Sequence, residues 1–130
     1  MPKTITVLDQ SAERVAQSLE LHVSSGSLTL RELIRIRVQN EVEDFNRKNS
    51  DIFTGLVQPT DTEVMLNGYR FRSRRTLDWQ AQYEAAIKAF EGNGFFVILD
   101  DQQIENLDEE LFLSEKSTVR FLRLVPLIGG

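Results

Sequence analysis

The last residues of the sequence are of the kinds that would allow a reaction at a C-terminal carboxylate. The sequence ends in Gly129 and Gly130, and the apolar residues Pro126, Leu127 and Ile128 precede them. Because glycine has no side chain, such an end can enter a narrow enzyme channel and present its carboxylate to a nucleotide or a nucleophile. We therefore expect the reactive group at Gly130 and Gly129. The three apolar residues before them are the expected recognition segment of the tail.

The remaining residues offer little to a catalytic mechanism. Cysteine is absent, which excludes thiolate nucleophiles, disulfides and cysteine-zinc sites. The single histidine, His22, has no second ligand or nucleophile at motif spacing, which favours a structural or surface role. The acidic clusters Asp100-Asp101 and Asp108-Glu109-Glu110 lack the spacing of a calcium loop, so we expect solvated turns. We predict no catalytic residue, no metal site and no cofactor, and hence a protein that is not an enzyme.

Arginines alternate with aromatic residues at Tyr69, Arg70, Phe71 and Arg72. Strands that bind nucleic acid can have this pattern, because the cations contact phosphates and the rings stack on bases. Alternation in a strand, however, sends the arginines to one face and the aromatics to the other. We therefore predict aromatics in the core, and Arg70 and Arg72 on a solvated face or on a surface that docks an acidic protein partner.

The composition indicates one globular domain. Hydrophobic residues make up 41% of the 130 residues and charged residues 27%, which is not typical of a disordered segment. The formal net charge of −5 argues against nucleic acid or an anionic membrane as a partner. No apolar signal segment opens the sequence, and no stretch approaches the roughly 20 apolar residues of a membrane span. We therefore expect a cytoplasmic protein.

Hydrophobic periodicity predicts the elements that would position the tail. Alternating or continuous apolar runs typical of strands cover residues 4–8, 19–23, 95–99 and 118–122. A wide polar turn is expected at residues 11–17, and a second turn at residues 100–103. Thr29 and Glu32 have the spacing of a capping box, and apolar residues then recur near the 3.6-residue period of a helix that ends at about residues 47–50.

The middle of the chain predicts a further hairpin and helix. Residues 63–66 and 69–72 flank Asn67-Gly68, the strongest short-range hairpin signal. Residues 77–91 have an apolar face with helical spacing, and a glycine-rich stop follows. We interpret this hairpin-helix segment, at about residues 49–93, as an insertion.

From Phe95 to Gly130 the sequence resembles the C-terminal half of a β-grasp, ubiquitin-like protein. It is similar in particular to the small sulfur carriers of molybdopterin and thiamine synthesis. The matching features are the Asp100-Asp101 turn, a buried leucine at Leu107 or Leu111, the strand start at Ser117-Thr118-Val119, and the tail from Pro126 to Gly130. The resemblance implies an α+β, β-grasp (ubiquitin-like) mixed sheet with one long packing helix. It also implies a single domain over residues 1–130 with the hairpin-helix insertion and a flexible tail at residues 125–130.

The resemblance further implies a function for the tail. An activating enzyme would adenylate Gly130 with ATP, and a conjugating enzyme would then transfer the glycine to lysines of a target protein. A deconjugating protease would reverse the step, as in bacterial operons that combine these enzymes, some of which act against phage. Strand alternation around Phe121 would place Leu122 and Leu124 on the outer face of the sheet, as a docking patch for the activating enzyme.

Two other functions stay open at this point. In a sulfur carrier, the adenylate of Gly130 becomes a thiocarboxylate that donates sulfur. The wholly apolar Pro126, Leu127 and Ile128 differ from the Leu-Arg-Leu-Arg-Gly-Gly end of eukaryotic ubiquitin and favour that reading. The chain length and the inserted segment favour a specialised modifier. A non-catalytic interaction module with an inert tail is the third alternative.

Overall fold

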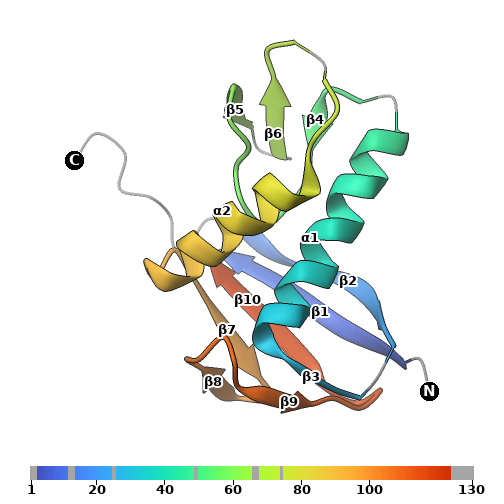
Figure 1. Cartoon of the computed structure of the whole chain (residues 1–130), viewed down its shortest axis with the longest axis vertical. Helices are drawn as coiled ribbons and strands as arrows, with labels where there is room; N and C mark the ends of the chain where they lie inside the picture. The colour runs from blue at the N-terminus through green and yellow to red at the C-terminus, as the bar shows by residue number, and fades with distance from the viewer. Residues whose placement is uncertain are drawn as a thin grey trace. The chain divides into compact units, whose positions relative to one another are not determined.

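Over the residues that the structure describes, the fold is mixed α+β, with one mixed sheet, two smaller sheets and two helices (Figure 1). The computed structural model describes residues 3–11, 14–24, 26–48, 50–65, 68–73 and 75–123. The chain divides into two compact units: unit 1 comprises Met1–Leu33 and Ala89–Gly130, and unit 2 comprises Ile34–Lys88. The α+β prediction is confirmed. The single-domain count and the insertion bounds stay predictions.

Unit 1 contains a five-stranded sheet in the order β2-β1-β10-β7-β8. Its strands are β1 (Lys3–Ser11), β2 (Arg14–Val23), β7 (Phe95–Leu99), β8 (Gln102–Ile104) and β10 (Thr118–Arg123). β1 and β10 pair in parallel, with Val7 opposite Val119, whereas the other neighbours are antiparallel. The sheet is therefore mixed, and its last strand lies between β1 and β7.

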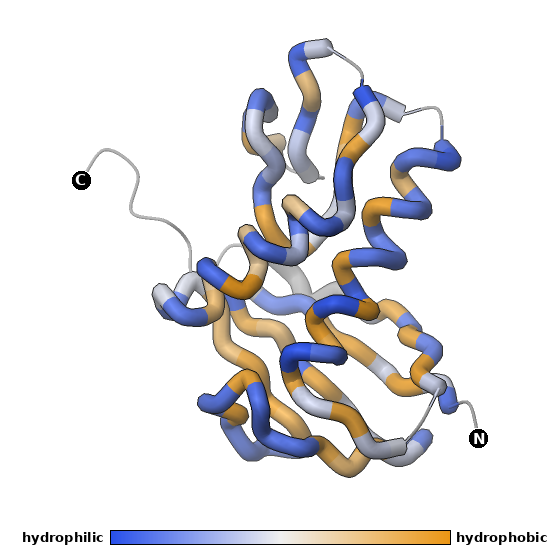
Figure 2. The backbone as a smooth tube through the Cα atoms, in the orientation of Figure 1, coloured by the Kyte–Doolittle hydropathy of each residue, from blue (hydrophilic) through white to orange (hydrophobic). Residues whose placement is uncertain are grey.

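Strand alternation divides this sheet into a buried face and a half-buried face. The buried side chains are Ile5, Val7, Leu21, Val23, Phe95, Val97, Ile104, Val119 and Phe121. The rings of Phe95 and Phe121 lie 5.9 Å apart between centroids. In Figure 2 these strands form a largely hydrophobic stretch of the tube, as expected for a sheet that contributes a core.

The first hairpin is longer than the sequence pattern indicates. β1 continues to Ser11 and β2 begins at Arg14, and these two residues pair across the hairpin end. The predicted wide turn over residues 11–17 is therefore wrong for Ser11 and for Arg14 to Gln17. A register shift between Asp9 and Ser11 marks a bulge, which lets polar residues continue the pairing.

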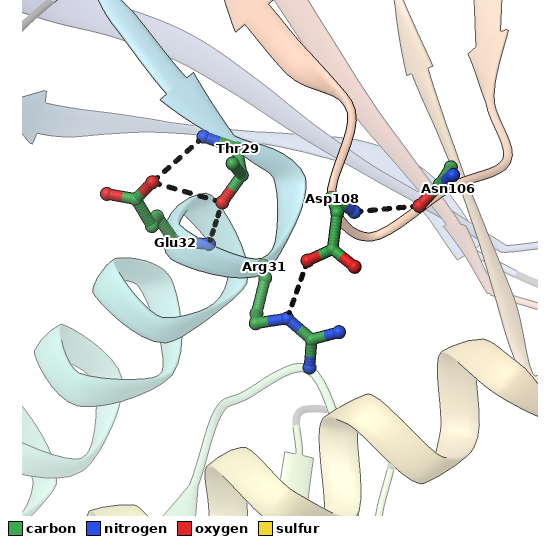
Figure 3. Close-up of polar contacts among 5 residues, drawn as sticks. All are labelled: Thr29, Arg31, Glu32, Asn106 and Asp108. Atoms are coloured by element: carbon green, nitrogen blue, oxygen red, sulfur yellow. Dashed lines mark hydrogen bonds and ion pairs between the residues drawn. The ribbon is translucent and has the colours of Figure 1, made fainter.

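The long helix α1 (Leu30–Arg47) begins with the predicted capping box. Thr29 Oγ1 accepts a hydrogen bond from the Glu32 amide at 3.2 Å, and Glu32 Oε1 accepts one from the Thr29 amide at 3.2 Å (Figure 3). The short strand β3 (Ser27–Thr29) directly precedes this helix. It pairs with another short strand, β9 (Glu110–Phe112). Six apolar residues of α1 are buried, whereas Ile36 is half-buried; the buried ones are Leu30, Leu33, Ile34, Val38, Val42 and Phe45.

Asp100 and Asp101 form the turn between β7 and β8. Both have positive φ, 47° and 73°, which Asp tolerates better than most side chains. Asp100 Oδ1 accepts a hydrogen bond from the Thr118 amide at 2.9 Å, so this turn is tied to the start of β10. The predicted turn is confirmed at its first two residues, whereas Gln102 already belongs to β8.

Unit 2 contains a three-stranded sheet in the order β4-β6-β5, built from β4 (Ile52–Phe53), β5 (Thr62–Met65) and β6 (Gly68–Phe71). Its core is aromatic: the ring of Phe45 lies 5.6 Å from that of Phe53 and 5.3 Å from that of Phe71. The hairpin of β5 and β6 is as predicted. The turn predicted at Asn67-Gly68 is wrong for Gly68, which is a residue of β6 and pairs with Met65, and Asn67 lies outside the described residues.

Helix α2 (Trp79–Glu91) starts two residues later than the apolar pattern predicts. Leu77 is instead held by Asn46, whose side chain bonds both the Leu77 amide at 2.9 Å and the Leu77 carbonyl at 3.0 Å. Asp78 Oδ1 accepts a hydrogen bond from the Gln80 amide and so caps the first turn. At the other end, the Gly94 amide donates to the Ala89 carbonyl at 2.7 Å, which closes the helix.

Candidate functional site

The final strand β10 brings the chain to the predicted reactive tail. It lies between β1 and β7 and ends at Arg123. The predicted conjugation, recognition and docking residues Leu124, Pro126, Leu127, Ile128, Gly129 and Gly130 lie outside the described residues. Their assigned roles therefore stay predictions, and the described part of the site is the sheet that leads to them.

Leu122 lies on the half-buried face of that sheet. It pairs with Phe96 on β7 and with Gln10 on β1. Two pairs further along the same ladder, Arg120 lies opposite Ile98 on β7. Paired residues share a sheet face, so these side chains belong to one surface.

We call this surface the outer sheet face and define it by Leu8, Phe96, Ile98, Arg120 and Leu122. Leu8 completes it from β1, where it pairs with Arg120. All five side chains are half-buried, in contrast to Val119 and Phe121, which are 0% exposed. The arrangement offers apolar contact area with a guanidinium among it, which is the chemistry of protein recognition.

Sequence reasoning identified Leu122 but missed the other four members of the outer sheet face. The alternation of residues 95–99 was a sufficient signal for Phe96 and Ile98, because Phe95 and Val97 point into the core. Leu8 and Arg120 required the parallel register of β1 and β10, which has no local sequence signal.

The predicted docking arginines belong to unit 2. Arg70 is exposed on β6, and its Nε lies 3.4 Å from Asp51 Oδ2. Arg72 is exposed beyond the strand. Phe71 is buried and Tyr69 half-buried, so the aromatics and Arg70 alternate as predicted. The partner of these arginines stays open.

His22 and Asp108 each contact one polar side chain of a neighbouring element. His22 is exposed on β2, where a hydrogen bond of 2.9 Å joins its Nδ1 to Thr4 Oγ1. Asp108 forms an ion pair with Arg31 at 3.1 Å. Across the described ranges, no three acidic or histidine side chains gather as a metal ion would require. None of the helices described there combines the length and apolarity of a membrane span.

A polar network missed by sequence reasoning lies on α1 in unit 2. Arg37 is 1% exposed, although the helical pattern suggested no buried charge at this position. Its Nη2 lies 3.2 Å from Glu41 Oε2, and Glu41 Oε1 accepts a hydrogen bond from the Leu56 amide at 3.2 Å. The pair thus anchors the segment after β4 to the helix, which is a structural role.

No family model matches the chain, and neither a curated protein nor a solved structure matches it.

Proposed function

We propose that this protein is a ubiquitin-like modifier of β-grasp fold, activated by adenylation of Gly130 and conjugated to amines of target proteins. The observation that carries the proposal is the position of β10. This strand lies in the interior of the five-stranded sheet and is parallel to β1. In the sequence, an apolar segment and then Gly129-Gly130 follow it. The resemblance implies this arrangement, namely a hairpin, a long helix, and a late strand beside the first strand.

The chemistry divides between the tail and its enzymes. The Gly130 carboxylate would attack the α-phosphate of ATP, which releases pyrophosphate and leaves an acyl-adenylate. A cysteine thiolate of a partner then displaces AMP to form a thioester, and a lysine amine displaces that thiolate to form an isopeptide bond. Unhindered glycines suit each of these attacks because no side chain shields the carbonyl carbon.

The outer sheet face supplies the recognition that the tail alone lacks. Leu122 is one residue from the end of β10, so an enzyme that holds the tail also passes close to Leu122 and Phe96. Activating, conjugating and deconjugating enzymes are the proposed partners, in a bacterial conjugation pathway. Because activation consumes ATP, the proposed compartment is the cytoplasm.

Mass spectrometry of conjugates tests the proposal directly. The N-terminally tagged chain is expressed in its native host and purified under denaturing, reducing conditions, beside a Gly130-deletion variant. Residues 124–130 contain no lysine or arginine, so trypsin would cleave after Arg123 and leave these seven residues on a modified lysine. Lysines that carry this seven-residue remnant, present with wild type and absent with the deletion, are the expected result. Wild-type protein with an unmodified Gly130 carboxylate and no conjugates would contradict the proposal.

A sulfur carrier is the second candidate, and the apolar character of Pro126, Leu127 and Ile128 favours it. In that case a sulfide-level sulfur donor displaces AMP from the adenylate, and a thiocarboxylate is left at Gly130. The intact mass of the same purified protein distinguishes the two functions. An oxygen-to-sulfur change at Gly130 without lysine remnants would establish the carrier.

A further inference from the structure

An open pocket of about 900 Å³ lies in unit 1. Its lining comes from the start of α1, the end of α2, the start of β7, and β8 with the loop that follows. The residues that matter for its chemistry are Arg31, Phe90, Glu91, Ile104, Glu105 and Asp108. All of them belong to the same compact unit.

The pocket combines an apolar wall with an acidic rim. Phe90 is half-buried, and its ring lies 5.7 Å from that of Phe95 between centroids. Ile104 is 3% exposed and forms part of the apolar lining. Glu91, Glu105 and Asp108 are exposed around this wall. A ligand in the pocket would therefore meet a ring and several carboxylates together.

Hydrogen bonds fix the loop that carries two of these carboxylates (Figure 3). The Arg31 amide donates to the Leu107 carbonyl at 2.8 Å, and the Leu30 amide donates to the Glu109 carbonyl at 3.2 Å. The Asp108 amide donates to Asn106 Oδ1 at 2.9 Å. Because the loop is tied to the first turn of α1, the acidic rim needs little reorganisation on binding.

The negative charge of the pocket favours a positively charged ligand. Three carboxylates face one guanidinium, and that guanidinium already lies 3.1 Å from Asp108 Oδ1 through its Nε. The chain as a whole carries −5. A cation is therefore attracted and an anion repelled. The exposed rim also suits a segment of a protein partner better than a small molecule, which needs a more enclosing cavity.

We propose that this pocket docks an arginine-bearing, extended segment of a protein partner. A guanidinium is planar, can stack on Phe90, and can donate paired hydrogen bonds to Glu91 or Glu105. Phe96 lines this pocket and also belongs to the outer sheet face, whereas Leu8, Ile98, Arg120 and Leu122 do not line it. The inference stands independently of the fate of Gly130, so either proposal can fail alone.

The probe for this site is a capped peptide of alternating glycine and arginine, with a citrulline peptide of the same length as its uncharged control. Amide chemical shifts of the full chain are followed by NMR during titration. We expect saturable shifts over residues 90–96 and 103–108 with the arginine peptide and none with the citrulline peptide. Shifts scattered over other acidic surfaces, no binding, or equal binding of both peptides would overturn the proposal.

Variants of matched charge separate the pocket from the overall charge. Glu91→Gln with Glu105→Gln removes two rim carboxylates, whereas Glu20→Gln with Glu115→Gln removes two exposed carboxylates elsewhere in unit 1. We expect the first pair to weaken peptide binding roughly fivefold and the second to leave it nearly unchanged. Equal weakening by both pairs would refute the site. Should the rim pair disturb the native spectrum, Glu105→Gln alone is compared with Glu115→Gln.

Discussion

Leu122 on β10 lies directly opposite Phe96 on β7, and both side chains are half-buried on the outer sheet face. Their strand neighbours Phe121 and Val97 also pair with each other and are fully buried. Alternate residues of these two strands therefore have different roles. One set of side chains packs in the core, and the other set forms the outer sheet face. A mutation can remove the surface without opening the core.

The outer sheet face is tested with Leu122→Asp. A carboxylate in the centre of an apolar contact costs desolvation energy, so this change should weaken binding to the activating enzyme about tenfold or more. Ser24→Asp is the matched control, since Ser24 is exposed and lies beyond the end of β2. Binding is measured by calorimetry, and urea unfolding checks that both variants stay cooperative. Unchanged affinity for Leu122→Asp would move the docking site elsewhere, with Arg70 and Arg72 the next candidates.

The core is tested with Phe121→Ala. Phe121 is 0% exposed and packs against Phe95, so truncation should lower the free energy of unfolding by about 3–5 kcal/mol. Denaturant unfolding monitored by circular dichroism measures the loss. Arg120→Ala on the opposite face is expected to cost much less, since Arg120 is only half-buried. Equal costs for the two variants would mean that strand alternation does not govern the energetics of β10.

A glycine in unit 2 provides a test of backbone geometry. Gly68 has φ of 145°, and a Cβ added there would lie 2.6 Å from the Phe53 carbonyl oxygen. Gly68→Ala should therefore destabilise the protein by at least about 1–2 kcal/mol. Gly94→Ala is the comparison, because its nearest contact would be 3.1 Å and its φ is not in the positive region. Thermal unfolding of both variants should rank Gly68→Ala as clearly the more damaging.

These comparisons also mark how far the sequence alone could lead. The strand over residues 95–99 and the capping box of Thr29 and Glu32 depend on local patterns, and both are confirmed. The strands β3 and β9 are three residues each, too short to produce a periodic signal. The acidic pocket depends on Arg31 meeting Asp108, 77 positions later, and such pairing has no local signature.

Acid sensitivity is expected at the C-terminal end of α1. A hydrogen bond from Lys48, together with contacts to Arg47, holds the pKa of Asp44 below its ordinary value of 3.8. The group therefore contributes stability above pH 3.8, and this contribution is lost as the pH falls through the lower folded-state pKa. Because the side chain is about half exposed, the effect should be a few tenths of a kcal/mol. Urea unfolding should show Asp44→Asn less stable than wild type at pH 7, with the difference shrinking as the pH is lowered well below 3.8. A difference that persists there would assign the loss to another cause.

The terminal glycine is expected to matter for transfer and not for folding. Deleting Gly130, or adding an alanine after it, changes the group presented to ATP while leaving β10 and the buried Phe121 intact. We therefore expect unfolding free energies within about 0.5 kcal/mol of wild type. With the activating enzyme and ATP, both variants should lose adenylation, measured as pyrophosphate exchange, because the carboxylate is displaced from the position that the enzyme recognises. A Gly130 deletion that still supports exchange would show that the diglycine end is not the reactive group, and the protein would then be better regarded as an interaction module.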